Sequence, residues 1–160
     1  MGKRADNLAK TLEQGAQALA SFASNLTESE WQKPLPQDGR KIGVVVHHVA
    51  TVYPLEIKLA QGVAKGDPVV GLHMDSIHTM NAGHAVDNDA VSKEDTIRLL
   101  NHNSAAAANA IRALSDEDLD TAVPVWLYAD APVTCQFVLE DHAVRHSYHH
   151  LAKMRATLNP

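Results

Sequence analysis

Histidine is the residue whose number and spacing most clearly suggest chemistry in this chain. The 160 residues include 10 histidines, and four of these lie between positions 142 and 150. His142, His146 and His150 follow one another at intervals of four, which places them along one face of a helix. Neutral imidazoles at that spacing are suitable ligands for a first-row transition metal. The cluster therefore predicts metal binding.

A tight site needs a further ligand from a facing helix, because one helix supplies only two well-placed histidines. The last predicted helix, residues 133–158, carries His146 and His150 on its apolar face. The second predicted helix, residues 41–65, carries His48 where an apolar side chain would continue its stripe. That stripe consists of Val45, His48, Val52, Leu55, Leu59 and Val63. We expect a metal site formed by His48, His146 and His150.

Other assignments of these histidines remain open. His142 and His146 form a competing pair that would move the site by one helical turn. His47 and His149 are each turned by about 100° from the proposed ligands and are weaker candidates. An inward histidine is also compatible with a simple buried hydrogen bond, and an outward one with a solvated helix surface.

No side chain stands out as a general acid or base, so the catalytic residues are unknown. Glu140 and Asp141 precede the histidine cluster but are expected to be solvated helix charges. Cys135 has no cysteine partner and is expected to be a small buried residue. Packing, boundary or capping roles are the simpler expectation for most of the other candidates near the site, while Asn81 is evenly balanced between such a role and contact with a ligand. These candidates are Trp31, Tyr53, Asp75, Asn81, Trp126 and Tyr148.

Apolar residues at intervals of three and four predict long helices over residues 4–26, 41–65, 92–114 and 133–158. Pro54 lies inside the second of them and is expected to kink it. A shorter helix is expected within residues 69–88, and residues 125–128 read as a short extended piece. No repeat or linker interrupts the chain. The pattern predicts an all-α fold, a four-helix bundle forming a single domain over residues 1–160, with a short extra helix between helices 2 and 3.

Charge and composition argue against several classes of protein. The formal net charge of −5 and the absence of a basic run disfavour nucleic-acid binding and attachment to an anionic membrane. Purely apolar runs, such as residues 44–46, are only a few residues long and far shorter than a membrane span, and no signal peptide is evident. A single cysteine is typical of a reducing compartment, so we expect a cytoplasmic protein.

Short motifs on the second and last predicted helices resemble those of a known family. The segments HHVA at residues 47–50 and HSYHHL at residues 146–151 are similar to the DinB/YfiT-like superfamily, as is MNAGHA at residues 80–85. The resemblance implies a four-helix bundle of up-down-down-up topology and a divalent metal held by the same three histidines. Relatives include S-transferases that use bacillithiol or mycothiol and a mycothiol-dependent maleylpyruvate isomerase. Homodimers are frequent among them.

Three histidine ligands leave a coordination position open, as in a catalytic rather than a structural metal site. We therefore expect a metal-dependent enzyme, either a thiol-dependent S-transferase or a hydrolase, acting on a small electrophilic substrate. A low-molecular-weight thiol is the expected partner of the first of these. Zinc or nickel is favoured as the metal, and iron or copper also suits three nitrogens. The alternative is a non-catalytic stress protein that binds a metal or small ligand, because the sequence shows no evident acid or base.

Overall fold

The structure, a computed structural model, describes residues 2–37, 39–71 and 73–159. Its α-helices are α1 (Lys3–Ser24), α2 (Glu28–Trp31), α3 (Ile42–Ala64), α4 (Met74–Asp87), α5 (Lys93–Arg112), α6 (Asp116–Asp120), α7 (Cys135–Leu139) and α8 (Arg145–Leu158). Strands β1 (Ala122–Pro124) and β2 (Pro132–Thr134) flank a short 3-10 turn, η1 (Trp126–Tyr128). A π-helical segment, η2 (Glu140–Val144), joins α7 to α8.

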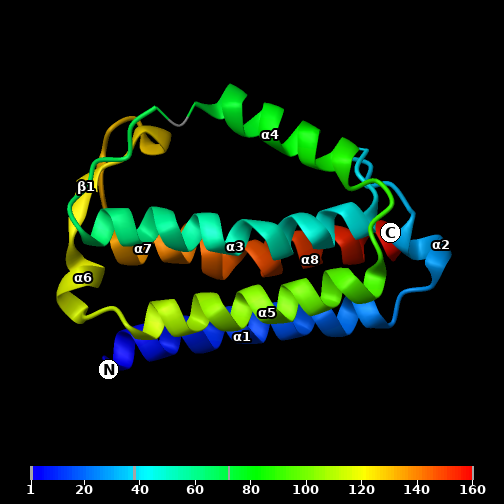
Figure 1. Cartoon of the computed structure of the whole chain (residues 1–160), viewed down its shortest axis with the longest axis horizontal. Helices are drawn as coiled ribbons and strands as arrows, with labels where there is room; N and C mark the ends of the chain where they lie inside the picture. Colours follow the sequence, from blue (N-terminus) through cyan, green and yellow to red (C-terminus); the bar gives the residue numbers. More distant parts are fainter. Residues whose placement is uncertain (1, 38, 72, 160) are drawn as a thin grey trace.

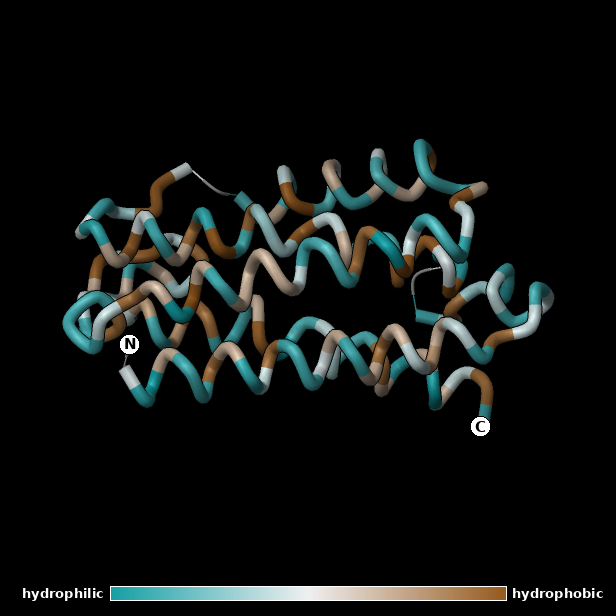
Figure 2. Tube along the Cα trace, turned by 60° about the horizontal axis from the view of Figure 1, so that its bottom comes forward, coloured by the Kyte–Doolittle hydropathy of each residue, from teal (hydrophilic) through white to brown (hydrophobic). Residues whose placement is uncertain are grey.

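The long elements α1, α3, α5 and α7–α8 form a four-helix bundle (Figure 1). Helix α1 packs against α5 and α8, and α3 packs against α5, α7 and α8. In Figure 1, α1 and α7–α8 run from left to right, whereas α3 and α5 run from right to left. Polar and apolar stretches alternate along the helices (Figure 2), and the buried apolar residues form a shared core. Helix α4 is the extra helix, and it lies outside the bundle.

Helix α3 continues through Pro54 as one element. Proline lacks an N–H group, so the carbonyl of Ala50, four residues earlier, loses its partner within the helix. Asn103 on α5 donates from Nδ2 to this carbonyl at 2.8 Å. A side chain of the neighbouring helix α5 thus replaces the missing backbone hydrogen bond. The carbonyl concerned lies two residues after His48 on the same helix.

The buried face of α3 beyond Pro54 differs from the predicted stripe. Leu55 was expected in that stripe but is 53% exposed, whereas Tyr53 is fully buried. The stripe was wrong here because α3 packs against both α5 and α7–α8, which turns a broader set of positions inward. Beyond the proline, the buried positions are Ile57, Ala60 and Val63.

Helix α3 is also the one helix of the described residues that is long and apolar enough to cross a membrane by length and composition. In the structure, 61% of its apolar window is buried inside the bundle. A core helix meets the same criterion, so this property alone does not indicate a membrane span.

Between α6 and α7 the chain forms a small hairpin. Val123 of β1 pairs with Val133 of β2 in an antiparallel register. The extended piece predicted over residues 125–128 is wrong, because most of that stretch is the 3-10 turn η1. Ala129 and Asp130 follow with positive φ angles of 55° and 59°, and the chain reverses there. The strands lie on either side of this reversal rather than within it.

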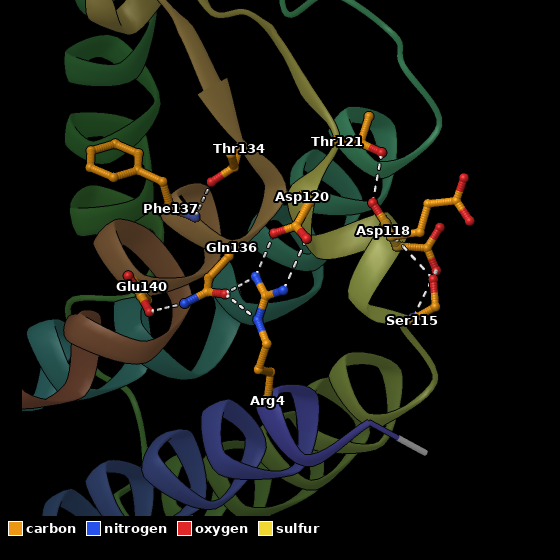
Figure 3. A network of polar contacts seen from close by, with 10 residues as sticks. Arg4, Ser115, Asp118, Asp120, Thr121, Thr134, Gln136, Phe137 and Glu140 are labelled. Atoms are coloured by element: carbon orange, nitrogen blue, oxygen red, sulfur yellow. Dashed lines mark hydrogen bonds and ion pairs between the residues drawn. The ribbon is translucent and has the colours of Figure 1, made fainter.

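Arg4, in the first turn of α1, ties the end of α6 to the start of the last helix (Figure 3). Its Nη1 and Nη2 donate to the two carboxylate oxygens of Asp120 at 3.0 and 2.6 Å. Its Nε and Nη2 donate to Oε1 of Gln136 at 3.1 and 2.6 Å. Gln136 in turn donates from Nε2 to Glu140 at 2.7 Å. This network fixes the beginning of the helix that carries two of the candidate ligands.

The last helix begins at Cys135 rather than Val133 and is not uniformly α-helical. Residues 140–144 are π-helical, with hydrogen bonds between residues five apart. Relative to an uninterrupted α-helix, such a segment rotates the residues that follow it. Ser147 is consequently fully buried, while His146 lies at the edge of the buried face. The predicted stripe placed His146 at its centre because it assumed a continuous α-helix.

Candidate metal centre

His48 of α3 and His146 and His150 of α8 converge in the structure. Each offers a ring nitrogen, and the three nitrogens lie within 4.8 Å of one another. The Nε2 atoms of His48 and His146 are 3.3 Å apart. Two nitrogens bound to one tetrahedral zinc ion lie about 3.4 Å apart, because each Zn–N bond is about 2.1 Å long. The donor set therefore fits a single first-row metal ion.

The three imidazoles differ in their exposure to solvent. His48 and His150 are buried, with 6% and 7% of their surface exposed, whereas the His146 side chain is 18% exposed. Burial, together with the neighbouring His146 and His48, lowers the pKa of His150 to about 2. His150 is therefore neutral and keeps a lone pair for a metal. Its Nδ1 is buried and has no hydrogen-bond partner among the described residues.

Glu56 is a residue of this centre that the sequence reasoning missed. Its Oε1 lies 2.5 Å from Nδ1 of His146, and its side chain is 10% exposed. A carboxylate accepts hydrogen bonds, so Nδ1 of His146 carries the proton and Nε2 presents its lone pair toward His48. The available signal was that Glu56 is the one acidic residue between positions 39 and 66, eight positions after His48.

We predict that Glu56→Ala weakens metal binding by about 10- to 100-fold, because carboxylates behind a histidine ligand orient the ring and raise its basicity. Glu56→Gln is expected to have a smaller effect, since the amide oxygen can still accept from Nδ1 of His146. Competition with a chromophoric zinc chelator measures the affinity. Equal affinities for wild type and Glu56→Ala would contradict a role for this carboxylate.

Tyr53 and Ser147 hold the two histidine-bearing helices in register. Both residues are fully buried, and their hydroxyl oxygens are 2.6 Å apart. Burial raises the pKa of Tyr53, so its hydroxyl stays protonated. Tyr53 was expected at the helix surface or boundary, and that expectation was wrong because the broad buried face of α3 includes it. Because Ser147 is next to His146, this contact fixes the position of His146 along the axis of α3.

The rival ligand His142 lies away from the three converging nitrogens. Its Nε2 is 3.1 Å from the hydroxyl of Tyr128, which donates to Asp141 at 2.6 Å. Asp141 was expected to be a solvated helix charge, but it is half-buried and paired with Arg145. His149 is exposed, as expected, and His47 contacts His84 of α4 through Nδ1 at 2.9 Å.

The remaining candidates lie outside the centre. Trp31 is buried, Trp126 packs edge-on against His73, and the hydroxyl of Tyr148 donates to the carbonyl of Thr11 at 3.0 Å. Burial raises the pKa of Cys135 to about 11, in keeping with the inert buried thiol expected there. Glu140 accepts from Gln136 instead, the backbone carbonyl of Asp75 accepts from Thr79, and neither carboxylate belongs to the group of converging donors found among the described residues. Asn81 is half-buried on α4.

Comparison with known proteins assigns the chain to a family. Residues 11–154 match the DinB superfamily. The chain belongs to the DinB superfamily. This confirms the resemblance to DinB/YfiT-like proteins inferred from the histidine motifs. No curated protein sequence matches the chain.

A solved structure supports the fold of this DinB-superfamily chain. This chain is similar to the solved structure of YfiT from Bacillus subtilis, which is described as a probable metal-dependent hydrolase with an unusual four-helix bundle topology. The TM-score is 0.76 at 18% identity, over 98% of this chain and 87% of YfiT. The predicted helical bundle is thereby confirmed. The three-histidine cluster in this fold suggests a divalent metal.

Proposed function

We propose that this DinB-superfamily protein is a metal-dependent hydrolase that acts on a small ester or amide. The observation that carries the proposal is the convergence of His48, His146 and His150 from two helices, with ring nitrogens within 4.8 Å. Three protein ligands leave a position for water or substrate, as catalytic metal sites require. The description of YfiT as a probable metal-dependent hydrolase supports the same reaction class.

The three histidines and Glu56 have different roles at such a site. When bound, a divalent metal polarises a carbonyl and lowers the pKa of a bound water toward neutrality. His48 and His150 supply buried neutral rings, and Glu56 orients the ring of His146. The partial exposure of His146 gives a small molecule access from one side. The second carboxylate oxygen of Glu56 is buried and has no hydrogen-bond partner among the described residues, so it can accept a bond from a bound molecule.

The metal in this proposal is zinc or nickel, with iron or copper as alternatives that three imidazoles also accept. A low-molecular-weight thiol as co-substrate, the homodimer and the cytoplasmic location stay predictions. Thiol transfer would use the same three ligands, because a metal also lowers the pKa of a bound thiol.

The test begins by measuring the metal content of protein purified without a histidine tag. We expect near-stoichiometric metal and turnover of a model ester that is lost on chelation and restored by zinc or nickel. Parallel assays contain a thiol with an electrophilic substrate. Turnover that requires the added thiol would replace hydrolysis by thiol transfer. Stoichiometric metal without turnover of any substrate would favour the binding protein instead.

A further inference from the structure

Helix α4 covers α3 without contributing to the core. Figures 1 and 2 both place it outside the bundle of long helices. None of its residues is buried, and the large side chains of Met74, Met80 and Val86 are exposed. Hydrophobic packing therefore contributes little to holding α4 in place. The polar contacts of the side chains that face α3 account for a larger share of what holds it.

His84 is the side chain through which α4 reaches the candidate metal centre. Its ring stacks on His47, with centroids 5.1 Å apart and an interplanar angle of 27°. It also meets the ring of His48 edge to face at 5.6 Å, nearly the 5.5 Å that separates His48 from His150. His84 is nevertheless not one of the three converging donors. It lies beside a proposed ligand without belonging to the ligand set.

The two ring nitrogens of His84 have different surroundings. Nε2 is 2.9 Å from Nδ1 of His47 and 3.5 Å from the hydroxyl of Thr51, so it is held by α3. Nδ1 is buried, and no described residue provides it with a hydrogen-bond partner. A buried nitrogen left unpaired is unfavourable, and a bound molecule that pairs with it relieves that penalty.

We propose that His84 is a positioning residue that hydrogen-bonds, through Nδ1, the molecule occupying the open coordination position. This rests on the metal centre of the proposed function. The substrates it favours carry a hydrogen-bonding oxygen or nitrogen next to the atom that faces the metal, as esters and amides do. In this role, helix α4 places the His84 side chain next to the bound molecule, although none of the residues of α4 is buried.

The test uses cobalt-substituted protein and azide, whose binding changes the visible absorption of the metal. His84→Ala is expected to keep its cobalt and to bind azide about tenfold more weakly than the wild type. His84→Asn places an amide near the position of Nδ1 and is expected to restore most of the affinity. His84→Gln, whose amide lies near Nε2, is not. His78→Ala, an exposed position on the same helix, is the matched control and should behave as the wild type.

Three results would overturn this role. Wild-type azide affinity in His84→Ala would show that the side chain does not contact the bound molecule. Loss of cobalt would make His84 a ligand instead. Rescue by glutamine rather than asparagine would show that His84 acts through His47. Hydrolase activity is measured separately, so a protein whose azide affinity depends on His84 but which cleaves no ester would refute the proposed reaction alone.

Discussion

Protein in which His146 is replaced by alanine is expected to purify without stoichiometric metal and without metal-dependent turnover. His146 Nε2 lies 3.3 Å from His48 Nε2, and its loss leaves two imidazoles to hold the ion. Changing a residue behind a ligand already weakens binding by about 10- to 100-fold, so losing a ligand should cost more than about 100-fold. Elemental analysis of the untagged protein measures the metal, and circular dichroism checks the fold.

The fold should survive this substitution. His146 lies at the edge of the buried face, and alanine is the best helix former. His142→Ala is the matched control, because His142 precedes His146 by four residues but contacts Tyr128 instead. It should keep its metal. Metal lost in His142→Ala but kept in His150→Ala would move the site one turn toward the start of the helix, because His142 and His146 would then be the ligands of the last helix. Metal retained in His146→Ala would contradict both placements.

The second large effect concerns stability, and we expect Gly43→Ala to destabilise the protein by about 2 to 5 kcal/mol. A Cβ at Gly43 would lie 2.3 Å from Cε2 and 2.5 Å from Nε1 of Trp31. Trp31 cannot easily yield, because it is buried and its Nε1 donates to the carbonyl of Val91 at 3.2 Å. Either the indole loses this bond or the start of α3 shifts. Urea unfolding followed by tryptophan fluorescence measures the difference.

Gly62→Ala is the control for this prediction, because it changes a glycine of the same helix. A Cβ there meets nothing within 4 Å. Alanine in a helix is favoured over glycine by about 0.5 to 1 kcal/mol, so Gly62→Ala should stabilise the protein. If both variants unfold at the same urea concentration, the close approach of α3 to Trp31 is not what requires glycine at position 43.

The long helices and the three converging histidines were predictable from the sequence because both depend on local periodicity. Apolar residues at intervals of three and four define a helix face, and His48 and His150 lie on such faces. The same periodicity locates helix ends only approximately, so the last helix was expected to begin at Val133 rather than Cys135.

The features that were missed depend on contacts between distant segments. Glu56 and His146 are 90 positions apart, and Tyr53 and Ser147 are 94 apart. Nothing in the sequence around Tyr53 indicates that a serine of another helix meets it. The π-helical turn and the hairpin at residues 122–134 likewise arise from how the chain closes on itself rather than from a local pattern.

The π-helical segment has a consequence for how chains of this kind can change in length. Such a turn takes up one residue more than an α-helix needs, without displacing the helix on either side. A one-residue deletion within Glu140–Val144 can therefore straighten the helix and leave His146 and His150 facing His48. The same deletion between His146 and His150 would turn the second ring away by about 100°. One-residue deletions in related chains should therefore be tolerated within this segment and not between His146 and His150.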